Sequence, residues 1–244
     1  TVQALAENKY VLCEKPMALS MAEAWKVDEA ERASCGKVQM CFIFRHDPLL
    51  EQLKAWIDEG LLGRPLLYRF GIYDERWDPE GNPDHCGRIM ETLTHGGPSV
   101  HDGAHTADFM HMLTNSPVVG VQAWGLKSRP EFPAPNYDIS IIDFENGDRA
   151  KIEIAWFYPV FPRDQFEVLG PAGLAEYNWH ERTLQLKCSN GVITRTDNTV
   201  WWETCFKTQL ARFVESVRNH GPCMPGVNEG LYSLKPLIPF ILAF

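Results

Sequence analysis

A segment near the start of the chain has the pattern of a strand, a helix and a second strand, and it constrains the fold more than any other feature. Tyr10–Cys13 and Val38–Phe42 are short apolar runs. Between them, Ser20–Glu23 is the capping box of a helix that ends before Gly36. A strand, helix and strand within about 30 residues form a βαβ unit with parallel strands and a right-handed crossover. We therefore expect part of a parallel sheet here.

The chain after residue 42 has a different pattern, in which a series of short strands dominates. Helices are predicted at 48–59 and 99–113, with a strand at 64–76 and a polar loop at 78–95 between them. Further strands are expected at residues 118–127, 137–144, 149–158, 165–169, 174–178, 183–187 and 192–195. Asn146-Gly147 is a two-residue hairpin signal between two of these strands. This succession predicts an antiparallel meander.

The last predicted element is an amphipathic helix over residues 202–219, which carries Phe206, Leu210, Phe213 and Val217. The predicted fold class is α/β. The end of a doubly wound parallel sheet is followed by an α+β domain with a large, mostly antiparallel sheet. The boundary between the two parts is expected near residue 42.

Composition excludes several classes of function. Lys and Arg number 23 against 32 Asp and Glu, so the formal net charge is −9 and a global surface for nucleic acid is not expected. The sequence has no apolar run long enough for a transmembrane helix, so no membrane partner is expected. Seven scattered cysteines favour reduced thiols and a cytoplasmic location. No two of the 18 glycines are spaced two apart, so the sequence contains no Gly-x-Gly-x-x-Gly phosphate loop.

Glu14, Lys15 and Pro16 directly follow the first predicted strand. Ligands of open parallel sheets bind at the carboxyl ends of the strands, so Lys15 is expected at the mouth of that crevice. An ammonium group there is able to donate a hydrogen bond to a substrate hydroxyl. The alternative is an ordinary surface lysine in a turn that ends at Pro16.

A second polar group lies between His101 and Asp108. On one helix, positions 101, 105 and 108 fall within a narrow stripe, so His101, His105 and Asp108 are expected to face the same way. A histidine exchanges protons near neutral pH, and a neighbouring carboxylate such as Asp102 orients it. The alternative is a set of buried histidines with satisfied hydrogen bonds.

Two further groups are weaker candidates. Arg45 and His46 follow the second predicted strand, where they line the same crevice or form a salt bridge at its rim. Trp77, Asp84 and His85 lie in the predicted loop, where they form a lid or a substrate wall, or have no function.

These motifs together resemble the Gfo/Idh/MocA family of nicotinamide-dependent sugar and polyol oxidoreductases. The resemblance extends from residue 11 to residue 173, and the motifs occur in the family's order. They are Val11-Leu12-Cys13-Glu14-Lys15-Pro16, Arg45-His46-Asp47-Pro48 with Gly60-Leu61-Leu62-Gly63, Gly96-Gly97 with Gly103-x-His105-x-x-Asp108, and the later sheet with Asn146-Gly147 and Gly170-Pro171-Ala172-Gly173.

The resemblance implies catalytic and cofactor roles. Lys15 matches the lysine that hydrogen-bonds the reacting hydroxyl beside the nicotinamide, and His105 matches the histidine that exchanges the hydroxyl proton. Glu14, Lys15 and Pro16 are expected to contact the cofactor, which is NAD or NADP. The implied reaction is hydride transfer between the nicotinamide and a sugar, cyclic polyol or related carbonyl substrate.

The resemblance also implies the surroundings of the substrate. His101, Asp102, Asp108 and Arg45 are expected to bind it. Residues 1–42 match a remnant of an NAD(P)-binding Rossmann domain, and residues 43–244 match a domain for substrate binding and dimerisation. The antiparallel sheet is then the surface through which a homo-oligomer forms.

The chain departs from the family in three places. His101 stands where the family often has an aspartate, and the nearest carboxylate is the adjacent Asp102. Ile43 stands where the family often has an asparagine. The family's first strand, glycine-rich loop and ribose-binding acid precede the point that matches Thr1. We therefore expect a truncated chain that is inactive in isolation and has negligible affinity for NAD(P).

Two alternatives remain open at this point. His101 and His105 have the i, i+4 spacing of a helical zinc pair, which is typical of metal-dependent hydrolases or lyases. Gly103 and the lack of a His-Glu-x-x-His sequence argue against that pair, and we assign no metal ligands. The other alternative is a non-catalytic sheet domain that dimerises.

Overall fold

The computed structural model describes residues 1–237 and contains a small parallel sheet at its start. After α1 (Val2–Ala6), β1 (Val11–Cys13) pairs in parallel with β2 (Val38–Met40), and α2 (Met21–Arg32) connects the two strands. The Ser20 side chain accepts a hydrogen bond of 3.2 Å from the backbone N–H of Glu23, as the capping box requires. The predicted strand, helix and strand are confirmed.

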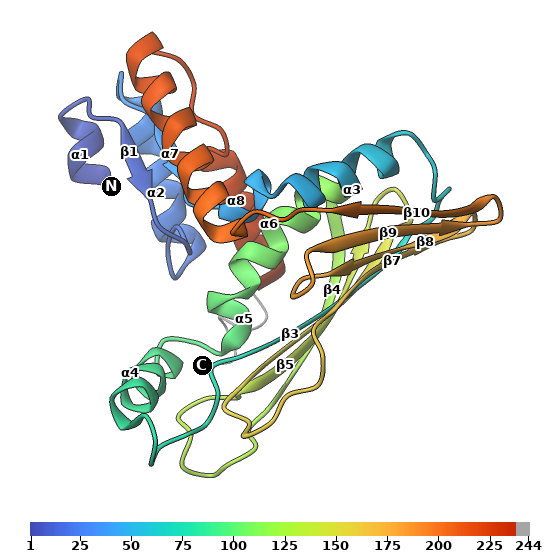
Figure 1. Ribbon diagram of the computed structural model, residues 1–244. Coiled ribbons are helices and arrows are strands. Elements are labelled where there is room, and N and C mark those ends of the chain that lie inside the picture. Colours follow the sequence, from blue (N-terminus) through green and yellow to red (C-terminus); the bar gives the residue numbers. More distant parts are fainter. Residues whose placement is uncertain (238–244) are drawn as a thin grey trace.

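A second sheet of eight strands dominates the rest of the structure (Figure 1). Its order is β10-β9-β8-β7-β3-β6-β5-β4, and all neighbours are antiparallel except β3 and β6. The strands are β3 (Leu67–Asp74), β4 (Val118–Leu126), β5 (Tyr137–Phe144), β6 (Arg149–Trp156), β7 (Gln165–Gly170), β8 (Gly173–Asn178), β9 (Thr183–Cys188) and β10 (Gly191–Thr196). These observations confirm the predicted fold class.

The expected simple meander is wrong in one respect. β3, the earliest of these strands in the chain, lies between β6 and β7 and pairs with both. Its burial alternates, with Tyr68 and Phe70 fully buried on the face that meets the helices. Hairpin signals specify only pairings between neighbours in the sequence, so no local pattern reports the insertion of an earlier strand.

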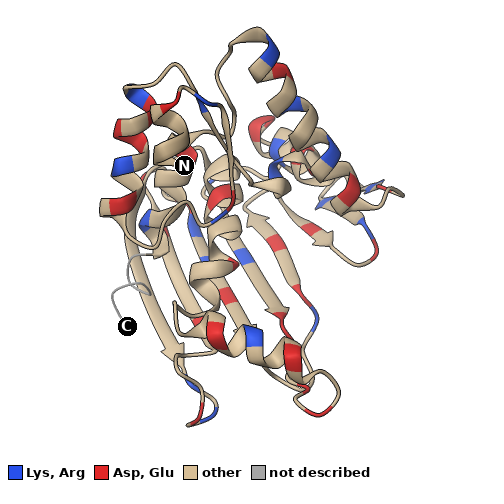
Figure 2. Ribbon diagram, turned by 90° about the vertical axis from the view of Figure 1, so that its left-hand side faces the viewer, with Lys and Arg blue, Asp and Glu red and all other residues tan. Residues whose placement is uncertain are grey.

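Helices cover one face of the large sheet (Figure 1). α3 (Pro48–Asp58) and α6 (Gly103–Thr114) contribute Leu50, Leu53 and Phe109 to a core shared with the buried side chains of the strands. The other face carries ion pairs such as Arg69 with Glu167, at 2.8 Å. Acidic and basic positions are intermixed on the helices and strands, as Figure 2 shows.

A second core joins the small sheet to the end of the described chain. α8 (Val227–Leu234), which precedes a 3₁₀ turn at Lys235–Leu237, contributes Val227 and Leu234 to a cluster with Val38 and Met40. Residues 238–244, the end of the predicted second domain, lie outside the described residues. None of the helices within residues 1–237 combines the length and the apolarity needed to cross a membrane.

The apolar stripe predicted for the last helix does not face the core. In α7 (Trp201–Asn219), the buried side chains are Cys205 and Gln209, whereas Phe206 and Leu210 are 45% and 53% exposed. The Gln209 carbonyl accepts a hydrogen bond of 3.0 Å from the Gln39 side chain on β2. The buried side of α7 therefore makes a polar contact with the small sheet, while the apolar stripe lies on the exposed side.

Two predicted segments differ from the structure between β3 and β4. Part of the predicted loop is a helix, α4 (Pro83–Leu93), whose Cys86, Ile89 and Leu93 pack in a third small core with Trp77. Asn82 is the N-cap residue of this helix and Pro83 is its first residue. Asn-Pro is also typical of loops, which explains why the sequence predicts a loop here. The predicted helix 99–113 is two helices, α5 (Pro98–His101) and α6, separated at Asp102.

Candidate active site

Lys15 connects the small sheet to the helices above the large sheet. It lies just beyond the carboxyl end of β1, and its Nζ donates a hydrogen bond of 3.1 Å to the backbone carbonyl of His101. The Lys15–Pro16 peptide bond is cis. The hydrogen bond holds the ammonium group at the junction of α5 and α6, which begins at Gly103, two residues before His105.

His105 is a largely buried histidine in the first turns of α6. Its ring lies edge-on to Phe44, with 4.8 Å between ring centroids, and to Phe42, with 6.3 Å. Its Nδ1 has no hydrogen-bond partner within the described chain. Burial and then the charge of Lys15 hold the pKa of His105 well below its usual value. The imidazole is therefore neutral at neutral pH and able to accept a proton.

Asp102 and His101 share the indole of Trp156. Trp156 Nε1 donates a hydrogen bond of 2.6 Å to Asp102, and the His101 ring stacks on the indole with 5.6 Å between centroids. Burial raises the pKa of Asp102 to about 6, although Lys15 and Trp156 act in the opposite direction. Burial, and then Lys15, lower the pKa of His101. The structure thus places both predicted residues beside Lys15.

Arg45 and Asp108 bind each other. Arg45 is in the 3₁₀ turn Ile43–His46, and its Nε forms an ion pair with the buried carboxylate of Asp108 on α6. Burial raises the pKa of Asp108 to about 7, and the Arg45 charge opposes that shift. Both are predicted to bind substrate, and in this structure Asp108 is 1% exposed. The contact that the structure shows for these two side chains is their ion pair with each other.

The remaining predicted residues lie in different places. Glu14 is exposed, and its carboxylate accepts a hydrogen bond of 3.3 Å from the backbone N–H of Lys15. His46 is buried, with Nδ1 3.1 Å from the Arg212 guanidinium. His85 forms an ion pair of 2.6 Å with Glu75 at the base of α4.

The geometry gives no support to the metal-binding alternative. His101 and His105 are on two different helices rather than one turn apart on a single helix. Within residues 1–237, no group of three or more His, Cys, Asp or Glu side chains is arranged to hold a metal ion.

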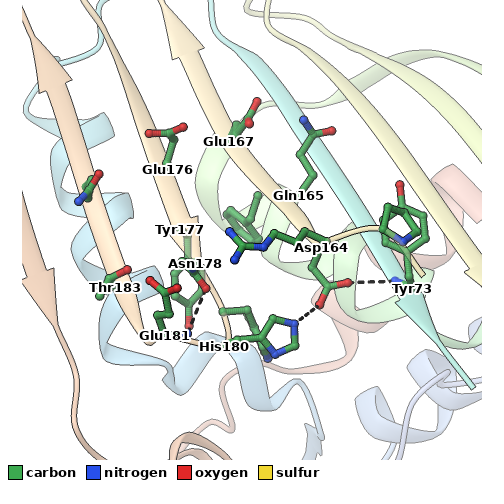
Figure 3. A pocket seen from close by; sticks show the side chains of 15 residues that line it. Tyr73, Asp164, Gln165, Glu167, Glu176, Tyr177, Asn178, His180, Glu181 and Thr183 are labelled. Atoms are coloured by element: carbon green, nitrogen blue, oxygen red, sulfur yellow. Dashed lines mark hydrogen bonds and ion pairs between the residues drawn. The ribbon is translucent and has the colours of Figure 1, made fainter. Parts of the chain in front are cut away.

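A pocket of about 360 Å³, which no sequence motif indicates, is lined in part by Phe44. Trp179, Trp201, Asp164 and His180 also line it. It merges with a more open groove of about 590 Å³ along β7 and β8, which Figure 3 shows. The sequence offers one feature of this pocket, the pair Trp179-His180 in the turn between two predicted strands. A turn sequence does not show which residues elsewhere in the chain pack against it.

Comparison with known proteins identifies the family. A model of the GFO/IDH/MocA C-terminal domain matches residues 50–176, which is more than half of the chain. The chain belongs to the GFO/IDH/MocA family. The resemblance seen in the sequence motifs is thereby confirmed.

Relatives in this family include inositol dehydrogenases. The inositol 2-dehydrogenase of Salmonella typhimurium is 40% identical over 116 residues, which cover 47% of this chain and 31% of that protein. The scyllo-inositol 2-dehydrogenase (NAD(+)) of Bacillus subtilis is 25% identical over 226 residues, which cover 89% of this chain and 63% of that protein. The matches thus span from about a third to under two thirds of these relatives' length.

Solved structures share the fold. Levoglucosan dehydrogenase in complex with NADH and levoglucosan superimposes with a TM-score of 0.83 at 19% identity, covering 99% of this chain and 74% of that chain. An oxidoreductase from Agrobacterium radiobacter in complex with NAD+, L-tartaric acid and magnesium gives a TM-score of 0.79 at 15% identity, covering 97% and 71%. At these identities, the likeness establishes a common fold.

Proposed function

We propose that the chain is the substrate-binding part of an NAD(P)-dependent oxidoreductase that acts on a CH–OH group of a sugar, cyclic polyol or related carbonyl compound. The observation that carries the proposal is the hydrogen bond from Lys15 Nζ to the His101 carbonyl. It holds a cation beside His105, a neutral imidazole with an unused ring nitrogen. The inositol and levoglucosan dehydrogenases among the relatives support this substrate class.

The two side chains divide the proton chemistry between them. In the oxidation direction, His105 accepts the proton of the substrate hydroxyl, as a neutral imidazole does. The Lys15 ammonium donates a hydrogen bond to the same oxygen and stabilises its developing negative charge. A bound nicotinamide would supply the acceptor for the hydride that leaves the substrate carbon. In the reverse direction, His105 returns the proton.

The residues present fit only one end of such a cofactor. Glu14, Lys15 and Pro16, at the carboxyl end of β1, would hold the nicotinamide end, and the unpartnered Nδ1 of His105 is close to Lys15. The sequence has no Gly-x-Gly-x-x-Gly loop for the pyrophosphate. We therefore expect negligible affinity of the 244-residue chain for NADH or NADPH in calorimetric titration, and micromolar binding would contradict this.

The division into domains and the oligomeric state belong to the same proposal. Residues 1–42 would be part of the NAD(P)-binding domain, and residues 43–244 would bind the substrate and a second subunit. The uncovered face of the large sheet supports a homo-oligomer, because in residues 1–237 the helices lie on its other face (Figure 1). Sedimentation of the purified protein tests the oligomeric state.

The test of the catalytic roles uses the product of the complete gene, with myo-inositol, scyllo-inositol and levoglucosan as substrates. Loss of general acid–base catalysis predicts that Lys15→Met and His105→Asn lower kcat by about 10²- to 10⁴-fold. The exposed Lys9 and His220 provide matched controls, and Lys9→Met and His220→Asn should retain kcat. Normal turnover in either active-site variant would show that the roles are misassigned.

A further inference from the structure

Asp138 is a carboxylate at a position of β5 that faces the core. It is 1% exposed, and Ile142 and Phe144, on the same face of the strand, belong to the main apolar core. Its Oδ2 accepts a hydrogen bond of 2.9 Å from the backbone N–H of Ser99, whereas its Oδ1 has no partner within the described chain. Burial raises the pKa of Asp138 to about 6, and hydrogen bonding by Ser99 opposes that shift. Burial of such a group is costly, so its place in the core indicates a role.

The hydrogen bond from Ser99 caps the short helix α5. Gly97 is the N-cap residue of α5, and it has no side chain that could accept a hydrogen bond from the first turn. Pro98 follows as the first helical residue and has no N–H, so the Ser99 N–H is the first donor of the helix that needs an acceptor. Asp138, 39 positions further along the chain, supplies that acceptor. The sheet thus anchors α5 at its N-terminal end.

Two glycines leave room for the Asp138 carboxylate. A Cβ at Gly97 would lie 2.8 Å from Asp138 Oδ2. Gly125, on β4, is paired with Asp138 in the sheet, and a Cβ there would lie 3.3 Å from Oδ1 and 2.9 Å from the Pro135 side chain. The backbone therefore approaches the carboxylate closely from two sides, and a side chain at Gly97 would displace it.

The helix α5 connects this anchor to Lys15. His101 is the last residue of α5, and its carbonyl accepts the hydrogen bond of 3.1 Å from Lys15 Nζ. The Asp102 N–H donates a hydrogen bond of 2.9 Å to the Pro98 carbonyl, which closes the single turn of α5. A shift at the start of this turn therefore moves the carbonyl that holds Lys15.

We propose that Asp138 is a positioning residue of the candidate active site, which anchors α5 to the sheet and thereby holds the Lys15 ammonium group beside His105. The inference rests on the proposed function, because it explains how the two proposed catalytic side chains are kept in place. Asp138 acts through α5 and not on the reacting atoms. A carboxylate suits this role because hydrogen bonds to a charged acceptor are about twice as strong as those to a neutral one.

The experiment measures the pKa of His105 by NMR titration of the 244-residue chain. The Lys15 charge lowers this pKa, so the pKa reports where the ammonium group lies. Asp138→Ala removes the acceptor of the Ser99 N–H, and we expect the pKa of His105 to rise toward its value in Lys15→Met. Loss of the Asp138 charge by itself acts in the opposite direction, since a carboxylate favours the protonated imidazole. An unchanged or lowered pKa in a folded Asp138→Ala would overturn the proposal.

Two further variants test whether Asp138 acts through Lys15. In the double variant Lys15→Met/Asp138→Ala, the pKa of His105 should equal that of Lys15→Met alone, because both changes act on one group. An additional rise in the double variant would contradict the proposal. Asp138→Asn keeps an oxygen acceptor in the same place and should retain the wild-type pKa of His105, whereas a pKa equal to that of Asp138→Ala would show that the acceptor is not the cause.

A matched control lies on the same strand. Ser140 is buried at the next core-facing position of β5, and Ser140→Ala should leave the pKa of His105 unchanged. Thermal unfolding verifies that each variant is folded. If Asp138→Ala does not fold, Asp138→Val takes its place, because valine suits a strand and also lacks an acceptor.

Activity of the complete gene product distinguishes this inference from the proposed function. Displacement of Lys15 should lower the kcat of Asp138→Ala by about 10- to 100-fold. If Lys15→Met and His105→Asn lose turnover while Asp138→Ala keeps the wild-type kcat and the wild-type pKa of His105, the positioning role is wrong and the function stands. If Asp138→Ala raises the pKa of His105 but turnover survives loss of Lys15 and His105, the catalytic assignment is wrong and the positioning role stands.

Discussion

The Nε of Arg45 lies 2.9 and 2.8 Å from the two carboxylate oxygens of Asp108. Arg45 follows the small parallel sheet, and Asp108 lies on α6, one turn from His105. The ion pair therefore holds the helix of the proposed catalytic histidine against the segment that leaves β2. The two residues predicted to bind substrate thus contact each other, and their contact fixes the position of α6.

Breaking this pair should destabilise the protein strongly. Arg45→Met leaves the Asp108 carboxylate buried without its partner, and removal of one member of a buried pair costs about 3–5 kcal/mol. The exposed pair of Arg149 and Asp143, at 2.5 Å, is the control, and Arg149→Met should cost less than about 1 kcal/mol. Urea unfolding measures both changes, and equal costs would contradict the assigned role.

His46 should contribute to instability in acid. Burial, then the charges of Arg212 and Arg45, lower the pKa of His46 to about 4. The folded protein thus disfavours the protonated ring, which the unfolded chain accepts near pH 6.5. Its contribution to stability is complete above pH 6.5 and is lost as the pH falls toward 4. His46→Gln should reduce the loss of unfolding free energy between pH 6.5 and 4, whereas the exposed His220→Gln should not. Parallel pH profiles for all three proteins would count against this prediction.

Lys15 should control the titration of His105. Burial is the larger cause of the lowered pKa of His105, and the Lys15 charge is the second. Lys15→Met should therefore raise the pKa of His105 while leaving it below its usual value. NMR titration of the imidazole measures the shift without any cofactor or turnover. Lys9→Met is the control, and a pKa of His105 that ignores the loss of Lys15 would mean that the two charges do not interact.

Two glycines should respond in opposite directions to alanine. A Cβ at Gly36 would lie 2.0 Å from the carbonyl oxygen of Lys9, so Gly36→Ala forces the backbone before β1 to move and should cost about 1–3 kcal/mol or more. A Cβ at Gly87, within α4, would meet nothing within 4 Å. Gly87→Ala should stabilise the protein by up to about 1 kcal/mol. Denaturant unfolding of both variants tests the contrast.

Local patterns predicted most of the strands accurately. The bounds of β5 (Tyr137–Phe144) coincide with those expected, and β7 to β10 differ by at most one residue at each end. Alternating burial and hairpin turns are properties of neighbouring residues, so they are legible without the fold. The same holds for β1, α2 and β2, and for the place of Lys15 at the end of a parallel strand.

Only part of the candidate active site could be predicted from the sequence. Helical periodicity predicts that His101, His105 and Asp108 lie on one stripe of a single helix. In the structure the helix is interrupted at Asp102, between α5 and α6. The rings of Phe44 and Trp179 are in contact although these residues are 135 positions apart in the chain, and Trp179 contacts Trp201, 22 positions further on. No spacing rule reports such contacts, since they arise only when separate elements pack.

The sequence by itself therefore determined the family, the fold class, the βαβ start and the order of chemical groups along the chain. Tertiary structure decided where β3 enters the sheet, which side of α7 is buried, and that Arg45 forms an ion pair with Asp108. The physical reason is the distance along the chain over which each interaction acts. Hydrogen-bonding and hydrophobic periodicity act between near neighbours, whereas burial, ion pairing and the pKa of His105 depend on groups that folding brings together.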